Sequence, residues 1–470
     1  MPASSYTINV KPQTEPTPTS MQSSKREGSF NAENKPRRSS SVRVLPVLED
    51  EDALHWLGGR VTIYAPMVMR NPKEEHRVSS ALEKLFDLTL VVALSAVSKQ
   101  FATNIQYGTA DMVHQTLVFI ISFFTTWNTW FPYVWFATTY DTDDILFRLG
   151  TFGEMIGILM ISDGIAHNES EVVVGYIVLR FFHGFFFRFR AAYQDPQRRD
   201  VNFKHGMLST IIMVCWYFQQ TYATTFLSQV LGFGALAFCD LAYPYVSQRT
   251  THPSKRTKYH AHHVSERYSE FTIIVFGESI LSLSHATVLK STTFNMEALS
   301  TCIASMSLLF MLWWIYFLVP FGQILHDKPS LTYTVAYGHF FIHAPLAAFA
   351  SGIYIVALGT QAGGTSHEEE NRHGSTETVD GAISISTAAF VIAISVSIFL
   401  MSIPLILSLP SKVVVRNLIA SIAMCIVATL APGHVSASAL MWLFCSPVLI
   451  VLLIILLSYR KKKSPIAVND

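Results

Sequence analysis

From residue 83 onward the chain alternates between long apolar runs and short polar segments. Each run holds roughly twenty residues, the length that an α-helix needs to cross the hydrocarbon core of a bilayer. The pattern therefore predicts an all-α fold, a polytopic transmembrane helix bundle of twelve spans. The predicted spans cover residues 83–103, 112–137, 146–166, 172–192, 205–225, 226–246, 264–287, 297–319, 330–358, 382–408, 413–431 and 435–458.

Composition supports the same class. Half of the 470 residues are hydrophobic and only 14 % are charged, which is too few for a soluble protein of this size. The five cysteines lie in apolar runs without paired spacing, so no disulfide framework is expected. No Walker, Rossmann, nucleophile-elbow or HExxH motif is present, so we expect neither an enzyme nor a cofactor, a bound metal or a nucleic-acid partner.

The segments outside the apolar runs indicate the orientation. Residues 1–50 are rich in Ser, Pro, Thr, Lys and Arg and predict a disordered basic tail. Residues 51–82 form a juxtamembrane segment and residues 461–470 a C-terminal tail. Basic residues concentrate in the even-numbered connections and after the last run, so both termini are predicted to be cytoplasmic. These basic residues are Arg188, Arg190, Arg198, Arg199, Lys204, Arg249, Lys255, Arg256, Lys258, Lys412, Arg416, Arg460, Lys461, Lys462 and Lys463.

Two parts of the chain match each other at an offset of 183 residues. EKLFDLTLVV (83–92) aligns with ERYSEFTIIV (266–275), and the match continues through both halves. It therefore predicts two parallel six-helix repeats, residues 83–258 and 259–460. Aligned pairs are Glu83 and Glu266, Lys84 and Arg267, Asp87 and Glu270, Trp130 and Trp313, Tyr133 and Tyr316, and Asp144 and Asp327. One departure is Ser95, which occupies the position that corresponds to Glu278.

Acidic residues within the first and seventh runs are the candidate functional residues. A carboxylate at the membrane centre costs about 3 kcal/mol or more, so it normally faces protein or water. We interpret Asp87, Glu270 and Glu278 as groups on an aqueous path for a proton or a cation. Glu83 and Glu266 allow another interpretation, in which they favour the helix dipole at the N-terminus and pair with neighbouring basic residues.

The predicted charge partners are basic side chains inside the apolar runs. Arg267 accompanies the acids of the seventh run, and Arg180 is a natural counter-ion for Glu154 or Asp163. Asp144 and Arg148 are four residues apart at the start of the third run, which predicts an ion pair on one helix face. His339 and His343 have a spacing that can hold a metal, but the sequence offers no evident third ligand.

Three motifs carry a resemblance: LEKLFDLTLVVAL (82–94), TTYDTDDILFR (138–148) and SERYSEFTIIVFGESIL (265–281). In order and spacing they resemble the low temperature requirement A (LtrA) family of membrane proteins, in its fungal form, over residues 77–460. The family's ELFFDL opening and its ERxxxxTIIxxGE signature correspond to the first and third motifs. The chain departs from the family at Lys84 and Leu85, and Thr142 stands where relatives have an arginine. The resemblance implies the architecture and a role in growth in the cold rather than a mechanism.

The leading hypothesis is a transporter or channel for a small solute, with a proton or a cation as the coupled or permeating species. The alternative is a non-transporting scaffold or sensor of a stress response, whose tail and loops recruit partners. Removal of residues 1–75 should then abolish the phenotype, while substitution of the acidic residues should not. An intramembrane enzyme acting on lipid would need a nucleophile and base that we do not find. Membrane lipids are expected partners, and homo-oligomer formation is left open.

Overall fold

The computed structural model describes residues 64–72, 74, 77–107, 111–167, 169–285, 295–369 and 377–463. The predictions for residues 1–50 and for most of the C-terminal tail lie outside these residues. Every regular element within the described ranges is helical, which confirms the all-α class. The first part of the chain forms α2 (Ala81–Tyr107), α3 (Met112–Ala137), α4 (Ile145–His167), α5 (Glu169–Phe182), η1 (His183–Phe189), α6 (Arg190–Gln194), α7 (Arg199–Tyr222) and α8 (Phe226–Arg249).

The second part of the chain begins after a short 3-10 turn, η2 (Pro253–Lys255). A second such turn, η3 (Pro329–Leu331), precedes α12. The helices of this part are α9 (Ala261–His285), α10 (Met296–Phe317), α11 (Phe321–Asp327), α12 (Thr332–Gly338), α13 (Phe340–Glu369), α14 (Glu377–Ile406), α15 (Ser411–Leu430) and α16 (Ala437–Lys463).

Eight helical segments in the described chain are long and apolar enough to cross a membrane. Three of them are the single helices α4, α8 and α15. Three more join consecutive helices and cover Glu171–Gln194 (α5 to α6), Met296–Asp327 (α10 to α11) and Pro329–Gly359 (η3 to α13). The last two are Ile385–Ile406 within α14 and Ala437–Ser458 within α16. Helices α2, α3, α7 and α9 are of similar length but are not among the eight. The structure thus confirms a multi-helix membrane bundle, while the count of twelve spans stays a prediction.

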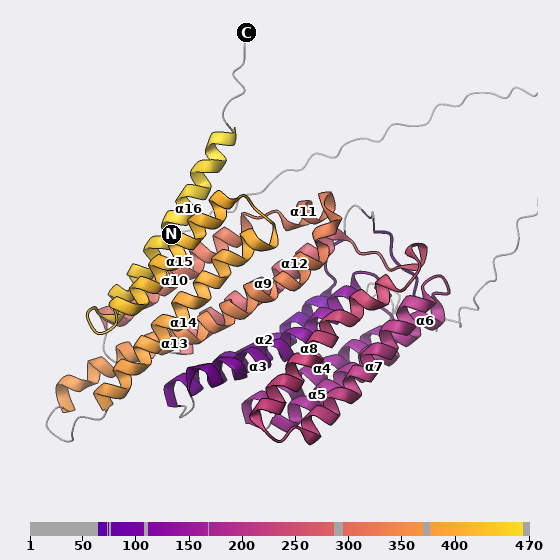
Figure 1. The fold of residues 1–470 in the computed structure, drawn as a ribbon, viewed down its shortest axis with the longest axis horizontal. Helices are drawn as coiled ribbons and strands as arrows, with labels where there is room; N and C mark the ends of the chain where they lie inside the picture. The colour runs from indigo at the N-terminus through magenta and orange to yellow at the C-terminus, as the bar shows by residue number, and fades with distance from the viewer. Residues whose placement is uncertain are drawn as a thin grey trace, which may run out of the picture. The chain divides into compact units, whose positions relative to one another are not determined.

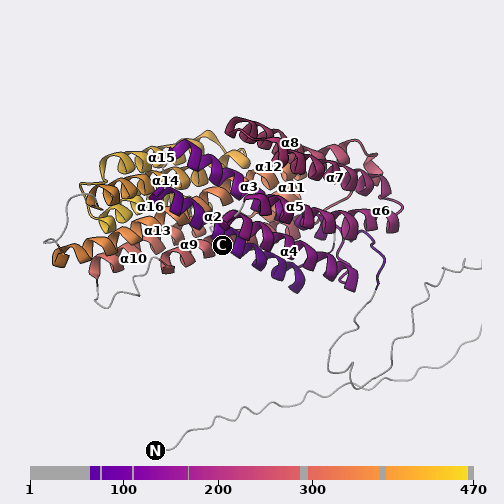
Figure 2. The ribbon, with the colours of Figure 1, turned by 90° about the horizontal axis from the view of Figure 1, so that it is seen from below.

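Helices α2 and α9 pack against each other in the interior of the bundle (Figures 1 and 2). Helices α4, α5, α7 and α8 lie on one side of this pair, and α13, α14, α15 and α16 lie on the other. Helix α2 packs on α4, and α9 packs in the same way on α13. Each of these partners then packs on the next helix in its series, α4 on α5 and α13 on α14. The helices that carry the candidate acids are therefore central.

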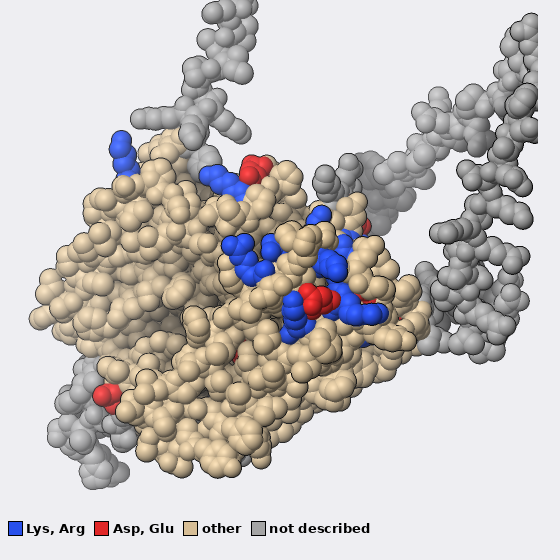
Figure 3. Space-filling view, turned by 45° about the vertical axis from the view of Figure 1, so that its right-hand side comes forward, with Lys and Arg blue, Asp and Glu red and all other residues tan. Residues whose placement is uncertain are grey.

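The outer faces of the bundle are apolar. On α8 the large side chains Leu227, Leu231 and Phe238 are 66 %, 64 % and 72 % exposed. Such a continuous apolar surface is unfavourable in water and is expected where lipid covers a helix. Lys and Arg gather at one end of the face seen in Figure 3, whereas its long flank is almost free of charge.

Helices α4 and α5 approach each other closely because glycines meet at their contact. A Cβ atom on Gly157 would lie 2.8 Å from the carbonyl oxygen of Gly175, and one on Gly175 would lie 2.7 Å from that of Gly157. Small residues are the usual means by which membrane helices bring their backbones together. This contact fixes the position of α5, which continues into η1 and carries the arginines described below.

The juxtamembrane residues before α2 pack on the loop between α3 and α4. The guanidinium of Arg77 donates to the carbonyl oxygens of Ala137 and Thr138, which end α3 and have no partner within the helix. The backbone N–H of Ala65 donates to the carboxylate of Asp144 over 2.8 Å. The TTYDTDD motif thus forms a folded junction that the preceding segment completes.

Candidate functional site

Asp87 on α2 and Arg267 on α9 form an ion pair inside the bundle. The nitrogen Nη2 of Arg267 lies 2.6 Å from Oδ1 of Asp87, and both side chains are at most 2 % exposed. The indole N–H of Trp130 on α3 donates to the same oxygen over 2.9 Å. Removing one member of such a buried pair leaves an uncompensated charge, so the pair locks α2, α3 and α9 together.

A second pair joins the same two helices at the corresponding positions. The ammonium of Lys84 on α2 lies 3.8 Å from the carboxylate of Glu270 on α9, and the side chain of Glu270 is 23 % exposed. Arg267 also approaches Glu270, at 3.5 Å. Lys84 corresponds to Arg267 and Asp87 to Glu270 at the offset of 183 residues. Each helix therefore contributes one acid and one basic residue to two equivalent ion pairs. The Asp87–Arg267 pair is buried, and the Lys84–Glu270 pair lies at the edge of the contact.

Glu83 caps its own helix and also reaches α9. Its carboxylate accepts from the backbone N–H of Ser80 over 2.7 Å, while the hydroxyl of Ser80 accepts from the N–H of Glu83 over 3.2 Å. This reciprocal arrangement is a capping box. The imidazole of His263 lies 3.3 Å from the same carboxylate, and Glu266 accepts from the hydroxyl of Ser79 over 3.4 Å. Glu83 is therefore held in the first turn of α2, whereas α9 has no acidic residue in its first turn and Glu266 lies one turn further on.

Glu278 lies on the same helix as Arg267 but has hydroxyl rather than cationic partners. Ser282 donates to its Oε1 over 3.1 Å, and the hydroxyl of Ser95 on α2 also interacts with the carboxyl. Its other oxygen has no hydrogen-bond partner among the described residues, although the side chain is buried. Ser95 is the residue that corresponds to Glu278 in the first half, so these two positions face each other across the helix pair.

The predicted pairing of Asp144 with Arg148 is wrong. Asp144 pairs with Arg190, and Arg148 pairs instead with Asp143 at 2.9 Å. Asp143 has a positive φ of 43°, which turns its carboxylate toward Arg148, while Asp144 accepts from the N–H of Phe147 and begins α4. Arg190 reaches Asp144 from a distant part of the sequence, and spacing within one helix carries no information about such a contact.

The second correction concerns Arg180, which pairs with Asp240 on α8 at 3.0 Å rather than with an acid of α4. Glu154 instead lies 2.9 Å from Nδ1 of His183, and Asp163 lies 2.9 Å from His167 at the exposed end of α4. The Arg180–Asp240 pair is fully enclosed. It joins α5 to α8 across the first half of the chain.

Asp240 is the centre of a buried polar network. Its carboxylate accepts from the indole of Trp216 over 2.9 Å, from the amide of Asn128 over 3.0 Å and from the hydroxyl of Tyr176 over 2.5 Å. Arg180 also donates to Tyr243 over 2.8 Å. Helices α3, α5, α7 and α8 all contribute to this network, which holds them around one carboxylate.

Asn128, Tyr176 and Trp216 also line a cavity of about 210 Å³, to which these four helices and also α2 and α4 contribute. We call it the outer cavity, because its lining continues toward the ends of the helices that were predicted to face away from the cytoplasm. Its polar lining includes the amide side chains of Gln219 and Gln229. The Asp240 network is therefore the floor of the outer cavity.

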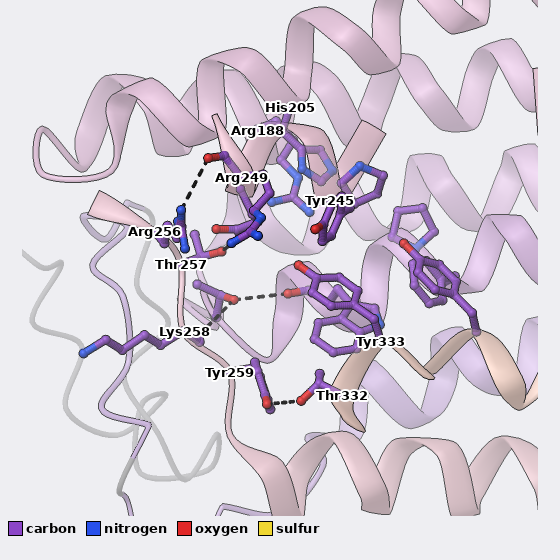
Figure 4. A pocket seen from close by; sticks show the side chains of 17 residues that line it. Arg188, His205, Tyr245, Arg249, Arg256, Thr257, Lys258, Tyr259, Thr332 and Tyr333 are labelled. Atoms are coloured by element: carbon purple, nitrogen blue, oxygen red, sulfur yellow. Dashed lines mark hydrogen bonds between the residues drawn. The ribbon is translucent and has the colours of Figure 1, made fainter. Parts of the chain in front are cut away.

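A second cavity, of about 330 Å³, lies toward the opposite ends of α3 and α8, and we call it the inner cavity (Figure 4). Its lining combines aromatic rings with basic side chains. The residues that line it are Phe131, Pro132, Trp135, Thr139, Arg188, His205, Pro244, Tyr245, Gln248, Arg249, Arg256, Thr257, Lys258, Tyr259, Thr332, Tyr333 and Tyr337. Tyr337 stacks on Phe131, with ring centroids 5.1 Å apart, and donates to the carbonyl of Leu241 on α8 over 2.8 Å.

The two cavities use different stretches of the same two helices. On α3, Asn128 lines the outer cavity and Phe131 the inner one, which places them about 4.5 Å apart along the helix axis. On α8, Phe233 belongs to the outer lining and Pro244 to the inner lining, with Asp240 between them. The Asp240 network and the Phe131–Tyr337 contact lie between the two linings.

The acids that the sequence singled out line neither of these cavities. Asp87 and Glu270 belong to the α2–α9 contact, and Glu278 lies between the same two helices. The residues that sequence reasoning missed are Asp240 as a network centre, Asn128, Tyr176 and Trp216 as its partners, and Arg188 as a cavity residue. For Asp240, Asn128 and Arg188 the visible signal was a charged or amide side chain within an apolar run.

The apolar outer faces and the apolar helices define a multi-pass integral membrane protein. The chain matches the family described as bacterial low temperature requirement A protein (LtrA) over residues 78–457, which is most of its length. It therefore belongs to the LtrA family, and the resemblance of its motifs is confirmed, while the fungal form stays a prediction. No match was found among curated proteins or among solved structures.

Proposed function

We propose that this LtrA-family protein transports a small solute across the membrane, and that the outer and inner cavities are the two ends of its path. The supporting observation is that both cavities lie along α3 and α8, with the Asp240 network between their linings. A carrier with a central site needs an opening on each side and a barrier that rearranges between them. In this proposal the Arg180–Asp240 pair and its partners are that barrier.

We further propose that the chain has twelve spans arranged as two parallel six-helix repeats. The packing of α2 on α4 and of α4 on α5 parallels that of α9 on α13 and of α13 on α14. The exchanged pairs of Asp87 with Arg267 and of Glu270 with Lys84 fit the same relation. In this arrangement the α2–α9 contact is the joint between the repeats.

Both termini are proposed to be cytoplasmic. The exposed cations Arg199, Arg249 and Lys255 belong to connections at one end of the bundle, where basic residues gather in Figure 3. Positive residues are retained on the cytoplasmic side of membrane proteins, so this end is the expected cytoplasmic side. In this orientation the inner cavity opens toward the cytoplasm.

Proton involvement is proposed for Glu278 rather than for Asp87. Asp87 already has Arg267 and Trp130 as partners, and a proton on Asp87 would weaken that ion pair. Glu278 is buried with serine hydroxyls, and one of its oxygens lacks a partner within the described chain. A buried carboxyl without a counter-ion is a typical site of proton uptake in transporters.

The experiment is proton flux into proteoliposomes that contain a pH-sensitive dye and the purified full chain. A proton gradient is imposed with sodium, potassium or inorganic phosphate as the accompanying solute. We expect at least one condition to give flux above that of empty liposomes, and Glu278→Gln to reduce it by tenfold or more. Asp163→Asn is the matched control, because Asp163 is an exposed acid on α4 whose ion-pair partner within the described ranges is His167. Wild-type flux equal to that of empty liposomes would favour the scaffold alternative, whereas unchanged flux in Glu278→Gln would overturn the role of Glu278.

A further inference from the structure

Arg188 is a buried cation of the inner cavity that forms no ion pair with a carboxylate among the described residues. Its side chain is 95 % buried, given a relative exposure of 5 %. The nitrogen Nε donates to Nε2 of His183 over 3.3 Å, and the guanidinium lies 4.8 Å from the centre of the Phe136 ring. Glu154 contacts the other nitrogen of the same imidazole, with its Oε1 2.9 Å from Nδ1 of His183, and it does not contact Arg188 directly. The two terminal nitrogens of Arg188 are left to the cavity.

The helix geometry at Arg188 explains why it turns inward. Residues His183–Phe189 form a π-helix, in which the backbone bonds run from residue i to i+5. His183 and Arg188 are five residues apart, so the π turn brings their side chains together on the inner side of the helix. Such π segments are frequent at functional sites. The turn thus presents the flat guanidinium, with its Nε already engaged, to the inner cavity.

The rest of the cavity lining is also positively charged. Arg249 and Arg256 also line the cavity, and none of the seventeen lining residues is acidic. Figure 4 shows the guanidinium groups of Arg188 and Arg249 and the rings of Tyr245 and Tyr333 turned toward one space, whereas the ammonium of Lys258 points away.

A second polar group in the lining lacks a partner. His205 is buried, and its Nδ1 lies 3.4 Å from the hydroxyl of Ser247. That hydroxyl donates to the carbonyl of Pro244 over 2.9 Å, so it accepts from His205. The other ring nitrogen, Nε2, has no hydrogen-bond partner in the part of the chain that the structure describes. Because Nδ1 is the donor of this neutral ring, Nε2 is an acceptor, so it points to a missing water or to a hydroxyl donor of a ligand and does not itself bind an anion.

We propose that the inner cavity binds a small anion of the phosphate or carboxylate class, held by the terminal nitrogens of Arg188. The planar guanidinium matches the two oxygens of such a group, and burial strengthens the interaction. The rings of Trp135, Tyr245 and Tyr333 provide a face for an apolar or aromatic part of the same ligand. A cavity of about 330 Å³ is at the lower end of the range for small-molecule sites. The inference goes beyond the proposed function, because anion binding does not depend on transport.

The anionic group can come from a soluble metabolite or from a lipid headgroup, and the test separates these sources. The purified full chain is placed in nanodiscs of neutral phosphatidylcholine and titrated with inorganic phosphate and with phenyl phosphate, while Tm is recorded. A parallel set of nanodiscs contains phosphatidic acid and receives no soluble ligand. Binding to the folded state raises Tm in proportion to the logarithm of ligand concentration above Kd.

We expect phenyl phosphate to raise Tm more than phosphate does, with a Kd that weakens at least tenfold in Arg188→Gln and less in Arg188→Lys. Arg148→Gln is the matched control, because Arg148 is an exposed arginine that pairs with Asp143 outside the cavity. If Arg188→Gln does not fold, Arg249→Gln at the exposed rim is expected to weaken the same Kd by about threefold. A rise of Tm only with phosphatidic acid, lost in the Arg188 variant, assigns the site to a lipid headgroup. An unchanged Tm with every anion, or equal shifts in wild type and Arg188→Gln, would overturn the proposal.

Discussion

Two buried arginines of this protein have opposite surroundings. Arg267, at the contact between α2 and α9, lies 2.6 Å from Asp87 and 3.5 Å from Glu270. Among the described residues, the close partners of the Arg188 guanidinium in the inner cavity are a histidine and a phenylalanine ring. A cation that has its acid within the fold holds helices together, whereas a cation without one leaves its hydrogen-bond donors for a ligand. Burial alone therefore does not mark a functional site, and the absence of an internal partner is more informative.

The largest effect is expected at the paired arginine. Arg267→Met leaves Asp87 buried without a counter-ion and should lower the free energy of unfolding by about 3–5 kcal/mol. The double variant Asp87→Leu with Arg267→Met removes both charges and should recover most of that loss. The measurement is denaturant unfolding in detergent micelles. A double variant that is less stable than Arg267→Met would show that the loss does not come from the unpaired charge of Asp87. It would then contradict the role given to the Asp87–Arg267 pair.

The next effect distinguishes the two arginines near the TTYDTDD motif. Arg190→Gln removes the partner of Asp144, which is fully buried, and should cost about 2 kcal/mol. Arg148→Gln removes an exposed pair and should cost less than about 1 kcal/mol. Unfolding of the two variants side by side checks this order. A larger loss of stability in Arg148→Gln than in Arg190→Gln would instead support the pairing of Asp144 with Arg148 that the sequence spacing indicated.

At the unpaired arginine the expected loss of stability is small. Without a ligand, Arg188→Met should change the free energy of unfolding by about 1 kcal/mol or less, because no carboxylate is left without a partner. The same variant should abolish the rise of Tm with phenyl phosphate. A loss as large as that of Arg267→Met would mean that Arg188 has a structural partner, and the contrast between the two arginines would then disappear.

The smallest effect concerns Glu74 in the juxtamembrane segment. The hydrogen bond from Arg70, at 2.7 Å, lowers the pKa of Glu74 below its ordinary value. Because the pKa is lowered in the folded state, the stabilisation is present above the ordinary glutamate pKa and is lost as pH falls through the lowered value. The side chains are about one-third exposed, so the contribution is below about 1 kcal/mol.

Tm of wild type and of Glu74→Gln, recorded between about pH 7 and about pH 3, measures this contribution. We expect a small advantage of the wild type at neutral pH that vanishes at the acidic end. An advantage that grows as the solution becomes more acidic would have the wrong sign for a lowered pKa.

Much of the helical architecture could be predicted from the sequence, because long apolar runs leave few other folds. The run 226–246 corresponds to α8 (Phe226–Arg249), and the run 146–166 to α4 (Ile145–His167). The repeat alignment also placed Asp87 and Arg267 on helices that prove to be in contact. That prediction was accessible because both residues lie in aligned motifs.

The cavities could not be predicted, because they depend on contacts between distant residues. Asp240 was visible as an acid in an apolar run, but its partners come from three other helices. The π turn at His183–Phe189 rotates Arg188 inward, and no residue type in HGFFFRF requires a π turn. The i, i+4 rule failed at Asp144 because Arg190 competes for it from outside the helix.

The central claim is that the outer and inner cavities are two ends of one path closed by the Asp240 network. Its most direct test uses a chain in which the five native cysteines are replaced and one cysteine is added, at Gln229 in the outer cavity or at Gln248 in the inner cavity. A membrane-impermeant thiol reagent is applied to right-side-out and to inverted vesicles, with and without Asp240→Asn. The account predicts that each cysteine reacts from its own side only and that Asp240→Asn lets the reagent reach Gln248→Cys from the outside. Reaction of both cysteines from the same side, or no change with Asp240→Asn, would contradict it.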